Sequence, residues 1–230
     1  MKTIYTHFTG TQHLNENKEC QDIIKVYETD DLNITVLCDG AGSKKFGTKS
    51  ATLVAKTTIE YFKNGLNNFN ASEFIEHINN TLEENELNEK NAGTTLIFLV
   101  SDKSKYIIGH LGDGVVLEND GNGFKVVSLP ENGHLANITY FLPSEEATEH
   151  FRYKTGKLNN KPSFILSSDG AASFLYDSST LLGYNACNLL EEWAKTLEKS
   201  ECEKRILTSI ETELTKFSSD DMSIAISIYK

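Results

Sequence analysis

Residues 33–40, NITVLCDG, form a short run of apolar and β-branched residues that stops at Asp39 and Gly40. Residues of this kind favour a buried strand, and the Asp-Gly pair predicts its end. The same arrangement returns in residues 163–170, SFILSSDG, where a similar strand stops at Asp169 and Gly170. Two strands far apart in the chain are therefore predicted to end at an aspartate.

The rest of the chain alternates between groups of helices and groups of strands. Apolar residues at helical spacing predict helices over 50–66, from Asn70 onward, over 189–197 and over 206–217. Further strands are predicted at 94–100, 105–111, 115–117, 124–129 and 222–228. Strands grouped apart from helices indicate an α+β fold in layers. No repeat or Pro/Gly/Ser-rich linker divides residues 1–230, so we expect a single domain.

The composition of the chain limits the classes of partner that the protein can bind. The chain has 230 residues with 33 acidic and 22 basic side chains, a net charge of −11. This charge disfavours nucleic acid, whose binding proteins need a basic face. No apolar run approaches the ~20 residues of a membrane span. The N-terminus lacks the apolar block of a secretory signal, and we expect a soluble cytoplasmic protein.

Aspartates recur where strands begin or end. Asp39, Asp113 and Asp169 follow predicted strands, and Asp220 and Asp221 precede the strand at 222–228. If these ends meet, the carboxylates repel one another or take up protons unless a cation lies among them. Oxygen ligands select hard ions such as Mg²⁺ or Mn²⁺.

The Asp-Gly pairs have a second interpretation, because Asp-Gly is also a common hairpin turn. We interpret Asp120-Gly121, set among Asn119, Asn122 and Gly123, as a turn only. Asp113-Gly114 lies between two predicted strands, and turn and ligand both remain open there. Asp39 and Asp169 lead into helical or mixed segments, which favours ligands.

Residues 42–50, GSKKFGTKS, look like a phosphate-binding P-loop between a strand and a helix. That motif needs lysine directly after the second glycine, and here Thr48 stands between Gly47 and Lys49. Nucleotide binding is therefore the weaker interpretation of this segment.

Six short motifs, taken in order, resemble the protein phosphatase 2C family of metal-dependent serine/threonine phosphatases, particularly its compact bacterial members. The matching motifs are Cys20-Gln21-Asp22, Cys38-Asp39-Gly40-Ala41-Gly42, Gly93-Thr94-Thr95, Gly112-Asp113-Gly114, Ser168-Asp169-Gly170 and Asp220-Asp221-Met222-Ser223. The resemblance implies a four-layer α-β-β-α sandwich of two antiparallel sheets flanked by helices. It also implies hydrolysis of phosphoserine and phosphothreonine in proteins, with water as the nucleophile.

The resemblance also implies roles for single residues. Asp39 would bridge two Mn²⁺ or Mg²⁺ ions, with the Gly40 carbonyl on the second ion and Asp169 and Asp220 on the first. Asp22 would orient the attacking water, and Asp113 with Asp169 would hold a looser third ion.

This sequence departs from the family pattern at three points. Gln21 stands where a glutamate is usual, and Ala41 replaces a histidine or methionine. The usual phosphate-binding arginine is absent; Lys18 or His13 could take its place, and of the two we favour His13. These departures motivate an alternative, a weak or inactive pseudophosphatase that binds phosphoproteins. In either case we expect a monomer with a phosphorylated protein as its partner.

Overall fold

The computed structural model describes residues 1–67, 69–131 and 139–229. Contacts divide the chain into two compact units, each assembled from separate segments. Unit 1 comprises Met1–Cys20, Gly114–Leu129 and Asn159–Lys230, and unit 2 comprises Gln21–Asp113 and Pro130–Leu158. The chain thus passes repeatedly between the units, and neither is one continuous stretch of sequence.

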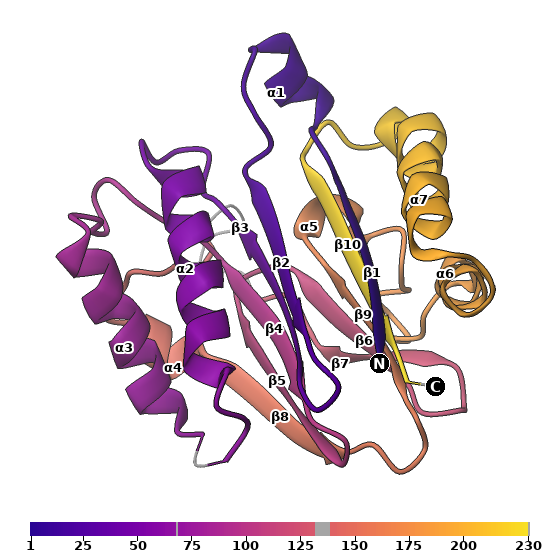
Figure 1. Ribbon diagram of the computed structural model, residues 1–230. Helices are drawn as coiled ribbons and strands as arrows, with labels where there is room; N and C mark the ends of the chain where they lie inside the picture. The colour runs from indigo at the N-terminus through magenta and orange to yellow at the C-terminus, as the bar shows by residue number, and fades with distance from the viewer. Residues whose placement is uncertain (68, 132–138, 230) are drawn as a thin grey trace. The chain divides into compact units, whose positions relative to one another are not determined.

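Unit 1 contains an antiparallel five-stranded sheet in the order β1-β10-β9-β6-β7 (Figure 1). Its strands are β1 (Lys2–Phe8), β6 (Val115–Asn119), β7 (Phe124–Ser128), β9 (Ser163–Ser167) and β10 (Met222–Ile228). Its helices are α1 (Thr11–Asn15), α5 (Asp169–Ala172), α6 (Asn185–Thr196) and α7 (Lys199–Glu213), with a 3₁₀ turn at Leu214–Lys216.

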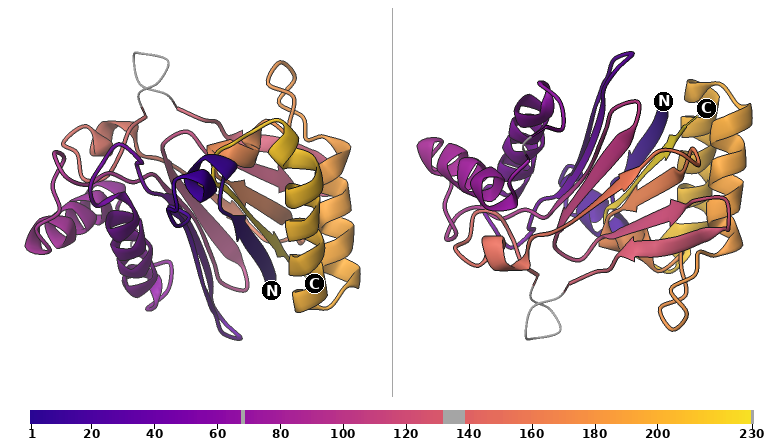
Figure 2. Two further views of the ribbon diagram at one scale, coloured as in Figure 1. Left: turned by 90° about the horizontal axis from the view of Figure 1, so that it is seen from above. Right: turned by 90° about the horizontal axis from the view of Figure 1, so that it is seen from below.

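The core of unit 1 forms between its sheet and the helices α6 and α7. Ile224, Ile226 and Ile228 alternate along β10 and join one buried cluster with Ile206 and Ile210 of α7. Helix α7 packs against β1 and α6 against β10, and the two helices lie side by side (Figure 2). The predicted alternation of strand 222–228 is confirmed.

Unit 2 contains a second antiparallel five-stranded sheet in the order β2-β3-β4-β5-β8. Its strands are β2 (Asp22–Glu28), β3 (Asn33–Asp39), β4 (Leu96–Ser101), β5 (Lys105–Leu111) and β8 (Arg152–Lys157). Its helices are α2 (Gly47–Phe62), α3 (Ala71–Glu84) and α4 (Ala147–His150). Helix α2 packs on β2 and β3, and α3 lies beside α2.

An aromatic cluster holds these helices on the sheet of unit 2. Phe62 of α2, Phe74 of α3 and Phe98 of β4 are all buried, with ring centroids 5.0–5.7 Å apart. The Asn70 side chain accepts hydrogen bonds from the backbone N–H groups of Ser72 and Glu73, so α3 starts where the sequence predicts. Helix α2 begins three residues before the predicted Ser50.

The two antiparallel sheets and their helices confirm the predicted α+β class. Among the described residues, no helix combines the length and the apolar character that crossing a bilayer requires. The single domain over 1–230 stays a prediction.

Candidate functional site

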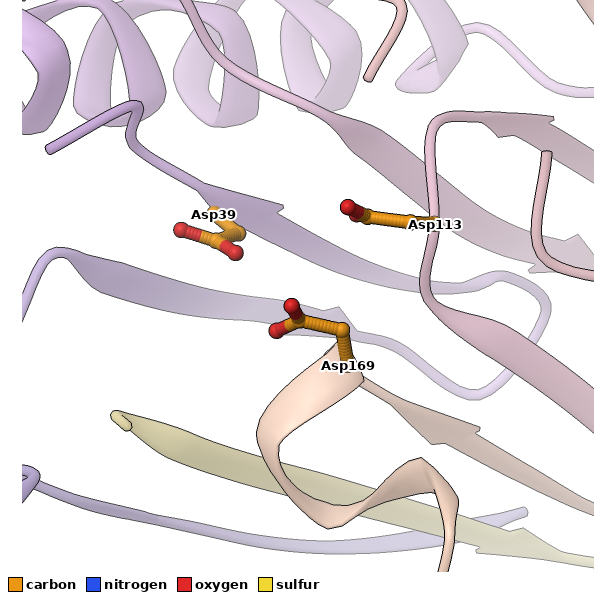
Figure 3. Close-up of side chains that lie close together, drawn as sticks. All are labelled: Asp39, Asp113 and Asp169. Atoms are coloured by element: carbon orange, nitrogen blue, oxygen red, sulfur yellow. The ribbon is translucent and has the colours of Figure 1, made fainter. Parts of the chain in front are cut away.

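The strand pairing of unit 2 brings three of the predicted aspartates to one edge of its sheet. Asp22 at the start of β2 lies directly opposite Asp39 at the end of β3. Strands β3 and β5 are both antiparallel to β4, so they end at the same edge, and Asp113 follows β5 there. A carboxylate oxygen of Asp39 lies within 4.8 Å of one of Asp113, whose side chain extends toward Asp39 (Figure 3).

The backbone of Asp39 is held by the two threonines of the Gly93-Thr94-Thr95 motif. The Asp39 N–H donates to Thr95 Oγ1 at 3.0 Å, and Thr94 Oγ1 donates to the Asp39 carbonyl at 2.9 Å. The Thr95 N–H donates to the same carbonyl at 2.9 Å. These bonds engage the main chain of Asp39, so a change of its side chain leaves them in place.

Position 40 has to be glycine because the backbones at Gly40 and Gly47 approach each other closely. A Cβ added at Gly40 would lie 2.6 Å from the carbonyl carbon of Gly47, in the first turn of α2. The Gly40 N–H donates to the Gln21 carbonyl at 3.1 Å, which ties this loop to the start of β2. The Asp-Gly pair at 39–40 is therefore not a hairpin turn, as its helical continuation predicts.

Negative charge at this edge acts on the neighbouring Cys38 thiol. Burial, followed by the charges of Asp39 and Asp22, raises the pKa of Cys38 well above its usual range. A thiol with so high a pKa is not ionised at neutral pH and is a poor nucleophile. The Asp22 side chain is also buried, at 2% exposure. A cation would relieve the repulsion among these carboxylates, and their oxygens suit Mg²⁺ or Mn²⁺.

Asp113 lies in a connection between strands of different sheets, β5 and β6, which excludes the hairpin interpretation of Asp113-Gly114. Thr139 Oγ1 donates a hydrogen bond to Asp113 Oδ2. The Gly112 carbonyl accepts from the Glu131 N–H at 2.9 Å and from Arg152 Nη2 at 3.4 Å. The sequence pattern did not single out Thr139, because its position relative to Asp113 depends on the tertiary fold.

Asp120 and Gly121 form the turn that the sequence predicts. They connect β6 and β7, which pair with each other, and Gly121 has φ +105°. Asp120 Oδ2 lies 3.0 Å from Lys125 Nζ. This aspartate therefore has a local role in the hairpin.

Unit 1 gathers a second set of predicted residues at one edge of its own sheet. Strands β9 and β10 are antiparallel, so Asp169 after β9 and Asp220 before β10 belong to the same edge. Asp169 is exposed and opens α5 (Figure 3). A Cβ added at Gly170 would lie 2.0 Å from the Asp221 carbonyl oxygen, so this glycine lets α5 approach the start of β10.

His13 reaches the same edge because β1 pairs with β10 and ends opposite its first residue. His13 Nδ1 lies 3.0 Å from Asp221 Oδ2, and the Gly10 N–H donates to Asp221 Oδ1 at 2.7 Å. Asp221 is buried, at 4% exposure, whereas the adjacent Asp220 is exposed. The sequence grouped Asp221 with Asp220 among the carboxylates at strand ends but gave it no role in orienting His13, although its place directly before a buried strand was a signal for burial.

Comparison with known families gives one match that spans most of the chain. The model described as "Protein phosphatase 2C" matches residues 9–216. This range includes five of the six motifs and ends before Asp220.

A curated relative and solved structures agree with this match. Serine/threonine-protein phosphatase 3 of Escherichia coli (strain K12) is 26% identical over an alignment of 196 residues, and the match covers 77% of this chain and 78% of the relative. The serine/threonine phosphatase Stp1 from Staphylococcus aureus has a TM-score of 0.70 at 17% identity, over 100% of this chain and 95% of that one. The structure of RsbX in complex with magnesium has a TM-score of 0.62 at 16% identity, over 99% and 94% of the two chains. At these identities the two structures show a shared fold.

Proposed function

We propose that this chain, which belongs to the protein phosphatase 2C family and is a protein serine/threonine phosphatase, hydrolyses phosphoserine and phosphothreonine in proteins at an aspartate-bound metal site. The observation that carries the metal site is the convergence of Asp22, Asp39 and Asp113 at one edge of the unit 2 sheet. Asp39 and Asp113 place carboxylate oxygens within 4.8 Å of each other, a spacing that suits ligands of neighbouring ions.

The proposed ligand set combines residues of both units. We assign Asp39 as the ligand shared by two ions, with the Gly40 carbonyl on one of them and Asp169 and Asp220 on the other. Asp113 with Asp169 would hold a third ion. The β9–β10 pairing supports the joint use of Asp169 and Asp220, and the Asp39–Asp113 spacing supports the use of Asp113. This division of ligands between the units is our reason to propose that residues 1–230 act as one domain.

The ions are proposed to be Mn²⁺ or Mg²⁺, since both accept carboxylate and carbonyl oxygens. When bound, such ions lower the pKa of the attacking water and neutralise charge on the phosphoryl group. Magnesium in the RsbX structure, which has the same fold, supports a hard divalent ion. Asp22, buried opposite Asp39, is proposed to accept a hydrogen bond from the water and orient it. The raised pKa of the Cys38 thiol argues against a cysteine nucleophile.

The test is phosphate release from p-nitrophenyl phosphate and from a phosphothreonine peptide, each with Mn²⁺, with Mg²⁺ or with EDTA. We expect release with at least one of the two ions and none in EDTA. Release that continues unchanged in EDTA would contradict the metal site. A folded protein that binds the phosphopeptide but releases no phosphate with either ion would instead favour the pseudophosphatase.

His13 is proposed to bind the substrate phosphate, and two substitutions separate this role from its contact with Asp221. Since a carboxylate only accepts, Nδ1 is the donor to Asp221, and Nε2 is the nitrogen left for phosphate, to which it donates when both ring nitrogens carry a hydrogen. The side-chain amide nitrogen of asparagine can take the place of Nδ1 and keep the contact with Asp221. The amide nitrogen of the longer glutamine can take the place of Nε2 and keep the contact with phosphate. We expect His13→Asn to raise KM for p-nitrophenyl phosphate with little loss of stability. We expect His13→Gln to lower the free energy of unfolding by about 1–3 kcal/mol, because buried Asp221 loses a donor.

The control for this pair is His7→Asn, since the exposed His7 lies on β1 outside the candidate site. Thermal unfolding and steady-state kinetics are measured for all three variants. An unchanged KM in His13→Asn would remove His13 from the proposed phosphate site.

A further inference from the structure

Two exposed lysines stand beside the candidate metal loop, in a segment to which the proposed chemistry gives no role. Lys45 Nζ lies 4.9 Å and Lys49 Nζ 5.6 Å from the centroid of the Phe46 ring. Phe46 is partly buried and packs against the unit 2 core, so the ring is a fixed support for both cations. We refer to Lys45, Phe46 and Lys49 as the Lys–Phe surface.

The two lysines have no acidic partner within the described part of the chain. Lys18, Lys63, Lys103, Lys125 and Lys195 each form an ion pair with a carboxylate, whereas Lys45 and Lys49, like Lys25 and Lys56, form none among the described residues. No described carboxylate lies within ion-pair distance of Lys45 or Lys49. The adjacent Lys44 differs from them, because its Nζ donates to the Glu89 carbonyl. The Lys–Phe surface therefore keeps two unpaired positive charges on a protein of net charge −11.

Lys49 also occupies a position that does not favour its helix. It lies in the first turn of α2, which contains no acidic residue, and a helix N-terminus favours negative charge. Helix α3 of the same unit has the favourable arrangement, with Glu73 in its first turn. Helix stability therefore does not account for a lysine at position 49.

The Lys–Phe surface adjoins the candidate metal loop. The backbones of Gly40 and Gly47 approach so closely that a Cβ on either glycine would meet the backbone of the other segment. Phe46 and Lys49 flank Gly47 in sequence, and the Lys44 N–H donates to the Ala41 carbonyl at 2.9 Å. The Lys–Phe surface is thus next to the loop that a phosphorylated residue of the substrate has to reach.

We propose that the Lys–Phe surface binds acidic residues that flank the phosphoserine or phosphothreonine of the substrate, so that the protein prefers acidic phosphoproteins. This inference rests on the proposed function and specifies its substrate class. An exposed charge pair changes affinity by about two- to fivefold, so two of them give a preference of about three- to thirtyfold.

The test compares two phosphothreonine peptides that differ only in their flanks, one with Asp and Glu and the other with Asn and Gln. Dissociation constants are measured with analogues that carry a nonhydrolysable phosphonate, and kcat/KM with the phosphopeptides. We expect the wild-type protein to bind the acidic peptide about three- to thirtyfold more tightly at low salt. This preference should shrink at high salt, because exposed charges are screened.

Lys45→Glu and Lys49→Glu should each remove or reverse the preference, and Lys49→Gln should reduce it. Lys56→Glu is the matched control, because Lys56 is exposed on the same helix about 10 Å further along and undergoes the same change of charge. We expect Lys56→Glu to keep the preference. An equal loss of preference in Lys56→Glu would overturn the proposal, because net charge alone would then explain the preference. Equal binding of both peptides by the wild-type protein would also overturn it.

Failure of this inference is distinguishable from failure of the proposed function. Hydrolysis of p-nitrophenyl phosphate, which has no flanking residues, tests the metal site alone. The binding ratio of the phosphonate peptides tests the Lys–Phe surface even if no phosphate is released.

Discussion

Asp39→Asn is expected to lower Mn²⁺-dependent phosphate release from a phosphothreonine peptide by more than about 100-fold. Loss of a residue that only supports a metal ligand typically costs about 10- to 100-fold, and Asp39 is proposed to be the shared ligand itself. The measurement is the initial rate of phosphate release at saturating Mn²⁺. Activity at the wild-type level would contradict the assignment of Asp39.

The same variant is expected to remain folded. Thr94 and Thr95 hold the backbone of Asp39, and an amide has nearly the shape of a carboxylate. Removing one charge beside Asp22 and Asp113 also reduces repulsion, so the unfolding temperature without metal should stay the same or rise. Asp120→Asn is the control, because Asp120 lies in the β6–β7 turn, and its phosphate release should match the wild type.

Gly170→Ala is expected to lower both the stability of the protein and its affinity for Mn²⁺. The added Cβ would lie 2.0 Å from the Asp221 carbonyl oxygen, and a backbone atom cannot move aside as the end of a side chain can. Overpacking of this kind costs about 1–3 kcal/mol of unfolding free energy. The strain also separates α5 from the start of β10, and with them the proposed ligands Asp169 and Asp220.

Denaturant unfolding and Mn²⁺ titration of Gly170→Ala measure these two effects. Gly121→Ala is the matched control, because Gly121 has φ +105° and nothing within 4 Å of an added Cβ. It should lose about 1 kcal/mol through backbone strain and keep its Mn²⁺ affinity. Equal Mn²⁺ affinity in Gly170→Ala and the wild type would show that this close approach does not position the ligands.

The strands that the sequence failed to predict, β1, β2 and β8, are three of the four edge strands, and the fourth, β7, was predicted. An edge strand pairs on one side only, so its sequence need not be apolar throughout. Strand β8, RYKTGK, alternates between partly buried and exposed residues and contains no aliphatic residue. The central strands β3, β4, β9 and β10 are apolar and largely buried, and their sequences predicted them well.

The sequence by itself determined the α+β class, the positions of the central strands and the aspartates at their ends, because these follow from local patterns of hydrophobicity and charge. Only the tertiary structure decided how each aspartate is used. It buried Asp221 against Gly10 and His13 but left Asp220 exposed, and it placed Asp113 between different sheets and Asp120 in a hairpin. Neighbouring residues with the same side chain differ in this way because their hydrogen-bond partners come from distant segments that strand pairing brings together.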